Sequence, residues 1–379
     1  EKGKWIIQGA ADNLHLPDGN IDVGNSGSLL YFLTPVLSTL KGECIFTGDE
    51  SICKRPVSHL IDALQQMGAQ AKCLKNKDCP PFSFCGPITS KKILNTEGKL
   101  SQYISGFMMA SSKMDGELQI NLSNPQETPY LTMTQTVLKE VGIESTISTD
   151  YKKINVKCGK KIEGFKTTIA SDWEGVAFPL VAALVSGSSI KIENIDFSGT
   201  QGDDKIVEVL QSVGAKITCD KENKCLIVES SGGTECFSTK KCPGGVLTVD
   251  ISSFPDAICA VSAFACFIDG KIVITNAEIC RKKETDRITA MKTELSKIGA
   301  VVEEKDDSLI IYGTKNGENL HGAQIESYKD HRIAMAFASI SLGLKAGESV
   351  IINDGECANV SFPDFYETMN KLGAGFVTI

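Results

Sequence analysis

The residues with the clearest chemical potential lie in 282–287, which reads KKETDR. Three cations and two carboxylates fall within these six residues. Arg and Lys bind phosphate and carboxylate groups, and a carboxylate held among cations can carry a proton to or from a reacting atom. Because Asp and Glu also favour the first turn of any helix, the stretch predicts either an anion site or a charged helix start.

Similar residue types stand at the starts of other expected helices. Small residues in GNSGS (24–28) let backbone amides approach a ligand. Cations, hydroxyls, an amide and carboxylates come from CKRP (53–56), LSQ (100–102), FPDA (254–257) and YKDHR (328–332). Helix N-termini attract anions because their first N–H groups lack partners and the helix dipole is positive there. Each residue alone is equally typical of a surface charge or an N-cap. Their recurrence favours one shared site.

These helix starts belong to a pattern that recurs five times along the chain. Each copy has a helical spacing of apolar residues, then glycine, then an alternating stretch that predicts a half-buried strand. Glycine suits the position after a helix, where the backbone is left-handed. The glycines are 72 to 85 residues apart and are Gly68, Gly142, Gly214, Gly299 and Gly373.

An earlier and more apolar helix precedes each amphipathic one, with a strand between them. The expected unit is therefore a strand, a buried helix, a strand, an amphipathic helix and two strands. Helices that are apolar nearly all round must be buried on every side, so we expect inner helices covered by outer sheets and amphipathic helices. Residues 1–22 are typical of the closing strands of a sixth unit whose helices are missing.

Composition narrows the class of protein. Hydrophobic residues make up 42% and charged residues 23% of the 379 residues, as in ordinary globular proteins. The net charge of −8 argues against broad nucleic-acid binding. No apolar run reaches membrane-spanning length, and no signal peptide opens the chain, so we expect a cytoplasmic protein.

Fourteen cysteines are many for a chain of this length, yet no C-x2-C spacing or histidine cluster predicts a metal site. A C-x5-C spacing occurs in the pairs Cys73/Cys79, Cys219/Cys225 and Cys236/Cys242. The first two pairs flank polar turns, so the two thiols of each pair are placed to face one another across a hairpin. Free thiols in a reducing cytoplasm are expected in preference to disulfides.

The order and spacing of these motifs resemble the 5-enolpyruvylshikimate-3-phosphate synthase family over essentially the whole chain. The matching motifs are VGNSGS, KRPVSHLIDALQQMGA, LSQYISGFMM, TPYLTMT, TQGDDKI, FPDA, KKETDRITAMKTELSKIGA and YKDHRIAMAFA. The resemblance implies an α/β fold of two domains, each an inside-out prism of βαβαββ repeats with helices inside and sheets outside. The expected domains are 1–163, with two full repeats and the tail of a missing one, and 164–379, with three repeats. The active site is expected in the cleft between them.

The same resemblance implies transfer of the enolpyruvyl (carboxyvinyl) group of phosphoenolpyruvate to the 5-hydroxyl of shikimate 3-phosphate, in the shikimate pathway to chorismate and aromatic amino acids. An acid protonates the enol carbon, the hydroxyl adds, and phosphate leaves a tetrahedral intermediate. Neither a metal nor an organic cofactor is implied. The implied partners are the two small-molecule substrates, with no nucleic acid and no membrane. A monomer is implied unless the missing repeat comes from another chain.

Each site residue of the family is carried over onto the matching position of this chain. The phosphoenolpyruvate set is Gly27, Arg55, Gln102, Arg287 and Arg332. The shikimate 3-phosphate set is Ser101, Gln102, Tyr130, Asp256 and Lys283. The catalytic set is Asp256, Glu284 and Lys283, in which Asp256 faces the acceptor hydroxyl and Glu284 handles the proton. Two carboxylates serve as acid and base when their environments separate their pKa values.

Five positions depart from the family pattern: Tyr31, Leu100, Glu127, Ile279 and Val360. Leu100 and Glu127 replace hydroxyls that would hold the acceptor phosphate, and Glu127 would repel it. Tyr31 and Val360 replace cations on the phosphoenolpyruvate side. Loss of one charge-assisted contact typically costs roughly 1.5–3 kcal/mol. Three alternatives follow: a synthase whose first repeat is trimmed or supplied elsewhere, a transferase with another acceptor, or a non-catalytic homologue that acts as a binding or structural module.

Overall fold

The computed structural model describes residues 5–10, 13–75, 78–162, 164–229 and 237–379. The chain divides into two compact units, unit 1 (Glu1–Thr168) and unit 2 (Ile169–Ile379), each with its own hydrophobic core. The division falls a few residues after the boundary expected at 163/164. No helix of the described residues is both long and apolar enough to cross a membrane.

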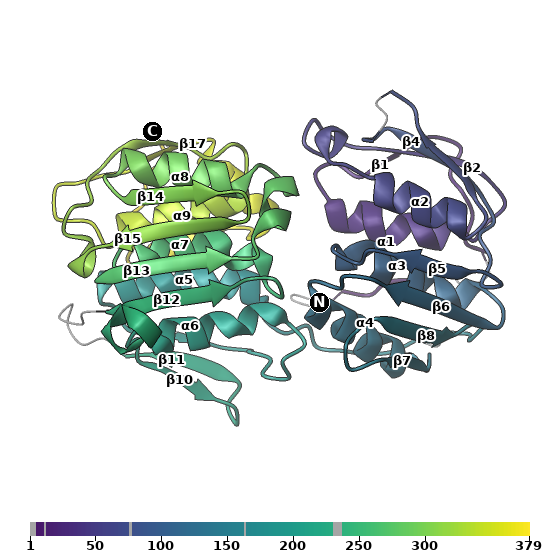
Figure 1. Cartoon of the computed structure of the whole chain (residues 1–379), viewed down its shortest axis with the longest axis horizontal. Helices are drawn as coiled ribbons and strands as arrows, with labels where there is room; N and C mark the ends of the chain where they lie inside the picture. Colours follow the sequence, from purple (N-terminus) through teal and green to yellow (C-terminus); the bar gives the residue numbers. More distant parts are fainter. Residues whose placement is uncertain (1–4, 11–12, 76–77, 163, 230–236) are drawn as a thin grey trace. The chain divides into compact units, whose positions relative to one another are not determined.

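Unit 1 contains two successive modules with the element order βαβαββ (Figure 1). The first module is β1 (Ile21–Asp22), α1 (Gly27–Leu37), β2 (Gly42–Thr47), α2 (Ser58–Gln66), β3 (Gln70–Cys73) and β4 (Phe82–Gly86). The second is β5 (Ile93–Thr96), α3 (Ser101–Ala110), β6 (Glu117–Leu122), α4 (Thr128–Glu140), β7 (Ser145–Ile147) and β8 (Lys153–Lys157). The predicted repeat is therefore observed twice in full.

Unit 2 contains one complete module between two modules with fewer strands in the described residues. The first is α5 (Trp173–Ser186), β9 (Ile190–Ile192), α6 (Ile206–Ser212), β10 (Ile217–Asp220) and β11 (Cys225–Val228). The complete one is β12 (Val246–Asp250), α7 (Ile258–Ala265), β13 (Gly270–Thr275), α8 (Arg287–Lys297), β14 (Val301–Lys305) and β15 (Ser308–Gly313). The last is β16 (Gln324–Glu326), α9 (His331–Ser341), β17 (Ile351–Asn353) and α10 (Phe365–Lys371).

Each sheet is built from the strands of a single module. The complete modules share one order, which is β1-β2-β4-β3, β5-β6-β8-β7 and β12-β13-β15-β14. The first two strands of each are parallel, for example with Val246 opposite Lys271, because a helix crosses between them. The later strands are antiparallel hairpin partners, as between β14 and β15. The predicted α/β class and repeat order are confirmed.

The more apolar helix of each module lies inside its unit. In unit 2, α5, α7 and α9 contact one another, and Figure 1 shows strands β12, β13 and β15 lying over this inner layer. All eight residues of α7 are buried, as its continuous apolar sequence predicts. The helix α2 is amphipathic instead, and it buries Leu60, Ile61, Ala63 and Leu64. Because every face of α7 is buried, only its two ends are left for polar functions.

The glycine after each amphipathic helix has the predicted left-handed backbone. The φ angles of Gly68, Gly142, Gly214, Gly299 and Gly373 lie between 84° and 108°. Side chains with a Cβ rarely adopt this region, so glycine ends each helix and turns the chain into the following segment. This feature of the repeat is confirmed in all five copies.

Two expected strand regions differ from the structure. The alternating tail after Gly373 forms no strand, because the backbone of Phe376 bonds with the side-chain amide of Asn370 instead of with another strand. Of the described residues in the expected closing strands, only Ile21–Asp22 form a strand. A stretch with strand periodicity becomes a strand only where a partner edge is available to it.

The thirteen described cysteines are free, in agreement with the expectation of thiols. Cys219 and Cys225 lie at different register positions of β10 and β11, where Cys219 is opposite Leu226 and Cys225 is opposite Asp220. They therefore do not face one another across the hairpin as expected. The pair Cys236/Cys242 includes Cys236, which lies outside the described residues.

Candidate active site

Four helix starts of unit 2 bring seven ionisable side chains together. Three of the helices are the inner ones, and side chains at their starts contact one another. We call this set the unit 2 cluster, and its members are Glu174, Asp256, Lys283, Glu284, Arg287, Asp330 and Arg332. It contains five of the predicted site residues.

Arg287, the first residue of α8, is the centre of the unit 2 cluster. Its side chain is 1% exposed. The guanidinium donates Nε to Asp330 Oδ2 at 2.8 Å and Nη2 to Asp330 Oδ1 at 3.1 Å, so the pair is bidentate. Nη1 also donates to Asp256 Oδ1 at 2.5 Å, and Nη2 donates to Glu284 Oε2 at 2.5 Å. One guanidinium thus links three carboxylates from three different segments.

Asp330 connects Arg287 to the start of α9. It is fully buried and is the N-cap of that helix, where its Oδ1 accepts from the backbone N–H of Arg332 at 2.9 Å. An aspartate at this position satisfies a helix N–H that would otherwise lack a partner. The same carboxylate therefore begins α9, orients Arg287, and fixes the backbone from which Arg332 extends.

Arg332 meets a carboxylate from α5. Its Nη2 donates to Glu174 Oε2, and its Nε lies 3.4 Å from Asp256 Oδ1. The Arg332 side chain is 9% exposed and that of Glu174 is 24% exposed. Asp256 also accepts from Lys283 Nζ at 3.0 Å. Asp256, in the turn before α7, therefore faces three cations.

Burial and ion pairing set the charge states in the unit 2 cluster. Burial opposes the charge of Asp256, but Lys283, Arg332 and Arg287 outweigh it and hold the pKa of this carboxyl well below its usual value. Burial also opposes the charge of Arg287, but Asp330, Glu284 and Asp256 raise the pKa of its guanidinium. For Glu174, burial dominates and raises the pKa despite Arg332. The carboxylates therefore differ in proton affinity, as acid–base chemistry requires.

The predicted residues of unit 1 gather around the starts of α1 and α3. We call them, with two neighbours, the unit 1 group: Gly27, Ser28, Arg55, Ser101, Gln102, Glu127 and Tyr130. A Cβ placed on Gly27 would lie 2.9 Å from Arg55 Nη1, so glycine lets the guanidinium lie against the start of α1. Gln102 Nε2 donates to Ser28 Oγ at 2.9 Å, which links the two helix starts.

Ser101 begins α3, and a carboxylate of the same unit occupies its donors. Glu127 Oε2 accepts from the Ser101 backbone N–H and from Ser101 Oγ, both at 3.0 Å. Glu127 is 3% exposed and has a φ of 50°, a left-handed conformation that costs glutamate roughly 1 kcal/mol or more. Its carbonyl accepts from the Tyr130 N–H at 3.1 Å. A buried anion thus stands where the resemblance implies an acceptor phosphate.

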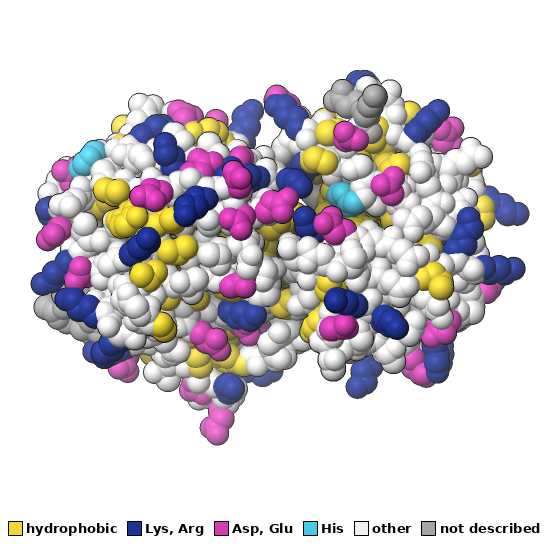
Figure 2. Space-filling model, viewed as in Figure 1, with side chains coloured by type: hydrophobic (Ala, Val, Ile, Leu, Met, Phe, Trp, Pro, Cys, Tyr) yellow, Lys and Arg dark blue, Asp and Glu magenta, His cyan; other side chains and the backbone are white. Residues whose placement is uncertain are grey.

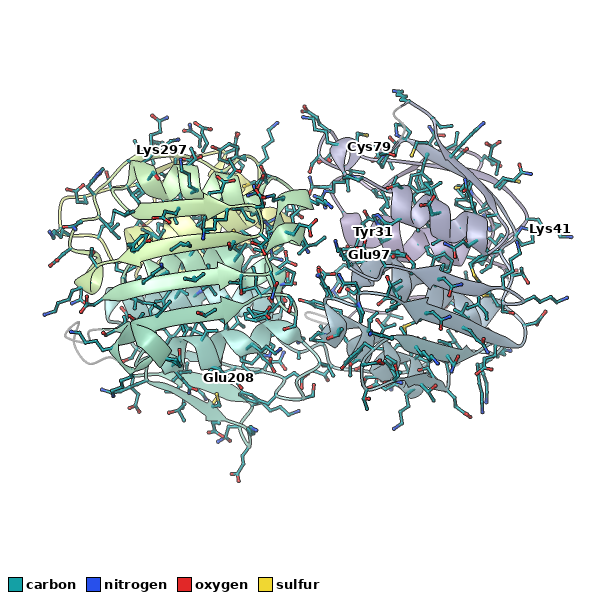
Figure 3. The ribbon with its side chains drawn as sticks, viewed as in Figure 1. Tyr31, Lys41, Cys79, Glu97, Glu208 and Lys297 are labelled. Carbon is teal, nitrogen blue, oxygen red and sulfur yellow. The ribbon has the colours of Figure 1, made fainter. Side chains whose placement is uncertain are left out.

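The other departing positions have apolar or external surroundings. Tyr31, labelled in Figure 3, is buried in the core of unit 1 and donates its hydroxyl to Pro56 O at 3.3 Å. Leu100 and Ile279 pack against the cores of their units. Val360 is 61% exposed. None of the four contributes a cation to its surroundings.

Two members of the unit 2 cluster were not predicted as site residues. Asp330 stands directly before a helix, and its type at that position indicated an N-cap without indicating its bonds to Arg287. Glu174 lies in an apolar helical stretch, and nothing in the sequence connects it with Arg332, which is 158 residues away. Asp330 and Glu174 each pair with an arginine of another module, and such contacts are visible only in the folded chain.

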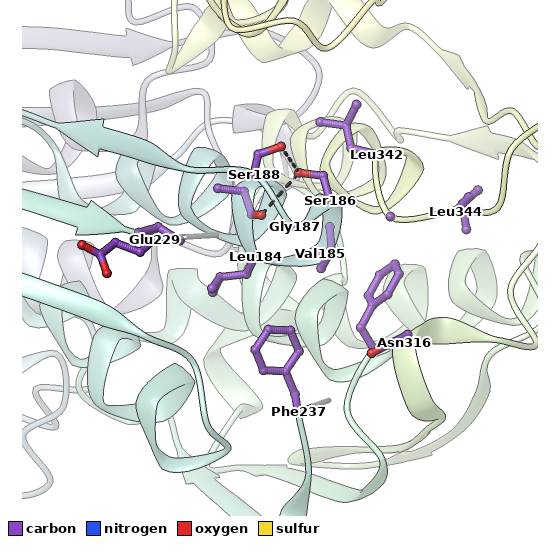
Figure 4. A pocket seen from close by; sticks show the side chains of 14 residues that line it. Leu184, Val185, Ser186, Gly187, Ser188, Glu229, Phe237, Asn316, Leu342 and Leu344 are labelled. Atoms are coloured by element: carbon purple, nitrogen blue, oxygen red, sulfur yellow. Dashed lines mark hydrogen bonds between the residues drawn. The ribbon is translucent and has the colours of Figure 1, made fainter. Parts of the chain in front are cut away.

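Apart from these two sets, the described residues form a cavity but no metal-binding group. A cavity of about 250 Å³ lies between the ends of α5 and α9, where Ser186 bonds Ser188 (Figure 4). None of the predicted site residues lines it. Over the described residues, no group of three or more His, Cys, Asp or Glu is arranged to hold a metal ion. On the face shown in Figure 2, cationic and acidic side chains are interspersed.

The fold and the unit 2 cluster define an α/β protein with cations and carboxylates gathered at the starts of its inner helices, the residue types that group-transferring enzymes use. Residues 1–369 match the family model of EPSP synthase (3-phosphoshikimate 1-carboxyvinyltransferase). The chain therefore belongs to the EPSP synthase family.

Curated relatives and solved structures agree with this family. The 3-phosphoshikimate 1-carboxyvinyltransferase of Methanocaldococcus jannaschii is 34% identical, covering 99% of this chain and 83% of the relative. The enzyme of the same name from Methanococcus maripaludis (strain C7) is 32% identical, covering 99% and 84%. An EPSP synthase structure from Acinetobacter baumannii has a TM-score of 0.70 at 25% identity, covering 94% of this chain and 80% of that chain.

Proposed function

We propose that this chain transfers the carboxyvinyl group of phosphoenolpyruvate to the 5-hydroxyl of shikimate 3-phosphate, releasing phosphate. The observation that carries the proposal is the unit 2 cluster, in which Asp256, Lys283, Glu284, Arg287 and Arg332 form one bonded network in a chain of this family. Membership of the family gives the reaction, and the network supplies the cations and proton carriers that the reaction needs.

The cations and carboxylates divide the work of the reaction. Arg332 of unit 2 binds an anionic group of phosphoenolpyruvate, and Arg287 holds the carboxylates of the unit 2 cluster in place. In unit 1, Arg55, Gly27 and Gln102 have the phosphoenolpyruvate-binding roles that the family implies. Lys283, Ser101 and Tyr130 contact the acceptor.

Glu284 is the proton carrier of the proposed reaction. It protonates the methylene carbon of phosphoenolpyruvate while the acceptor oxygen bonds to the adjacent carbon. When the carbon–oxygen bond to phosphate breaks, one proton of the new methyl group passes to Glu284, and the hydroxyl proton leaves with phosphate. Asp256 orients the hydroxyl as a hydrogen-bond acceptor, because its low pKa makes it a weak base at neutral pH.

One observation favours a second candidate, a carboxyvinyl transferase with another acceptor. Glu127 already occupies both donors of Ser101, so an acceptor phosphate must displace a buried carboxylate or bind elsewhere. An acceptor with a neutral or cationic group at that position would leave Glu127 in place. The two candidates share the phosphoenolpyruvate chemistry and differ only in the acceptor.

The proposal includes a monomer that acts in the cytoplasm. The thirteen described cysteines are free, which is typical of a reducing compartment. Light scattering after size-exclusion chromatography tests whether the protein is a monomer, in which case the eluted species has the mass of a single chain. A dimer that dissociates without loss of turnover would contradict the monomer and leave the reaction unaffected.

The proposed reaction is tested by phosphate release from phosphoenolpyruvate, with and without shikimate 3-phosphate. We expect release only with the acceptor, together with a product that retains the carboxyvinyl group by mass spectrometry. The Arg332→Ala variant is expected to lose this release. Release that shikimate 3-phosphate does not stimulate, with stimulation by a different hydroxyl compound, would select the second candidate.

A further inference from the structure

The pair formed by Glu174 and Arg332 sets Arg332 apart from the other buried arginine of unit 2. Glu174 lies in the first turn of α5, and Arg332 lies in the first turn of α9. The two inner helices are in contact, and Arg332 Nη2 donates to Glu174 Oε2. Asp172, the N-cap of α5, accepts from the backbone N–H of Glu174 at 3.1 Å and thereby fixes where the Glu174 side chain begins.

The hydrogen bonds of Arg332 are less complete than those of Arg287. Arg287 donates to three carboxylates, one of them in bidentate fashion. Arg332 has its side-chain bond to Glu174, and its buried Nε has no hydrogen-bond partner among the described residues, although Asp256 Oδ1 lies 3.4 Å away. A buried donor without a partner is costly. Arg332 is therefore the arginine of the cluster that a new anion would satisfy.

The charge balance of the unit 2 cluster points to the same pair. The unit 2 cluster has three cations and four carboxylates, and each cation already contacts at least one carboxylate, which disfavours an incoming anion. Asp256, Glu284 and Asp330 are all held by Arg287, whereas Glu174 contacts Arg332 from another helix. Glu174 is thus the carboxylate whose departure or neutralisation releases a cation, Arg332, without disturbing Arg287.

We propose that Glu174 is a resident counter-anion of Arg332, which the anionic group of phosphoenolpyruvate displaces, and that its carboxylate takes up one proton from solvent as it leaves. This inference rests on the proposed function, because it takes phosphoenolpyruvate as the incoming anion. It assigns to Glu174 a role in substrate affinity that lies outside the bond-making steps.

The surroundings of Glu174 agree with uptake of a proton. Burial raises the pKa of this carboxyl, and Asp256 and Asp172 act in the same direction. Arg332 opposes them, so a substrate that takes Arg332 away removes that opposition and raises the pKa of the Glu174 carboxyl further. Phosphoenolpyruvate is then expected to bind more tightly as the pH falls from 8 towards 6.

The test is calorimetric titration of phosphoenolpyruvate into the full chain at pH 7, in two buffers with different heats of ionisation. The variants are Glu174→Gln and Glu174→Ala. The matched control is Glu304→Gln, because Glu304 also pairs with an arginine, Arg281, at 2.9 Å and is 27% exposed, against 24% for Glu174. Circular dichroism checks that each variant is folded.

We expect both Glu174 variants to bind phosphoenolpyruvate about tenfold more tightly, since one competing charge-assisted bond has been removed. Wild type and control should take up protons on binding, seen as a buffer-dependent heat, and the variants should not. The buffer comparison on the wild-type chain stands even if a variant does not fold.

Three results would overturn the inference. Equal affinity and equal proton uptake in the wild type and the variants would show that Glu174 is not displaced. Weaker binding by the folded variants would show that Glu174 holds Arg332 in its substrate-binding position. Absence of phosphoenolpyruvate binding by every form would contradict the proposed function itself, and the inference would fall with it.

Discussion

The unit 2 cluster and the unit 1 group hold their cations in different ways. Arg287 is fully buried and bonded to three carboxylates, whereas Arg55 is half-buried, lies against Gly27 and donates to the Ser51 hydroxyl at 3.3 Å. A cation enclosed by carboxylates is oriented before any ligand arrives, and it costs little reorganisation during the reaction. If the proposed function is correct, unit 2 supplies preorganised chemistry and unit 1 supplies adaptable binding.

The largest expected effect comes from removing the central cation of unit 2. Arg287→Ala leaves Asp330, Asp256 and Glu284 without their shared partner in a buried place. Breaking a buried ion pair typically costs about 3–5 kcal/mol, so the melting transition of unit 2 should fall markedly and turnover should be lost. Differential scanning calorimetry and the phosphate-release assay measure the two effects.

The matched variant in unit 1 is Arg55→Ala. It should change the free energy of unfolding by no more than about 0.5 kcal/mol, because the side chain is partly solvated. It should instead raise the KM for phosphoenolpyruvate. Equal loss of stability in the two variants would contradict the distinction drawn between the two units.

The next effect concerns the proton carrier. Glu284→Gln keeps the size of the side chain and one acceptor for Arg287, but it cannot donate and regain a proton. We expect kcat to fall by about 10²–10⁴-fold, the usual contribution of a positioned acid–base group, with little change in KM. Glu208→Gln, on the exposed side of α6 and labelled in Figure 3, serves as control and should retain full activity. A Glu284→Gln enzyme with unchanged kcat would place the proton carrier elsewhere.

A smaller effect is expected from the buried anion of unit 1. Glu127→Gln removes a negative charge from the donors of Ser101, so an acceptor phosphate should compete better for them. We expect kcat/KM for shikimate 3-phosphate to rise by about tenfold, since a charge-assisted bond is replaced by a neutral one. Glu97→Gln, exposed in the same unit (Figure 3), should leave this value unchanged. A decrease in the Glu127 variant would mean that the carboxylate assists the acceptor, which favours the second candidate.

The last expected effect is on stability and not on activity: the free energy of unfolding should depend on pH through His331. Burial, Arg332 and Arg287 lower the pKa of His331 from 6.5 to about 4 in the folded chain. The unfolded chain therefore binds the proton first, and stability that is complete above pH 6.5 is lost as the pH falls towards 4. The loss from this residue is on the order of 3 kcal/mol.

His331→Gln should remove that part of the slope of melting temperature against pH between 6.5 and 4. Scanning calorimetry over this range, on the wild type and the variant, checks it. The same slope in both proteins would show that His331 is not responsible, and the buried carboxylates of the cluster would then be the groups to examine.

Much of the fold follows from local pattern. The apolar inner helices, the glycines after the amphipathic helices and the order of the modules were all predictable, because helix burial and left-handed turns leave marks on neighbouring residues. The tail after Gly373 was predicted wrongly, since strand periodicity does not tell whether a partner strand is present. The residue types of the unit 2 cluster were also predictable, with Asp256, Lys283, Glu284, Arg287 and Arg332 among the predicted site residues.

The sequence by itself therefore determined the repeated module, the helix starts and the kinds of charge placed there. Only the tertiary structure decided which carboxylate holds which guanidinium. Asp330 reaches Arg287 across 43 residues, and Glu174 reaches Arg332 across 158 residues. Such pairs depend on how inner helices from different modules pack together, and packing between modules leaves no periodic signal in the chain. The charges are local properties of the sequence, whereas their partners, and with them the proton affinities of the site, belong to the folded molecule.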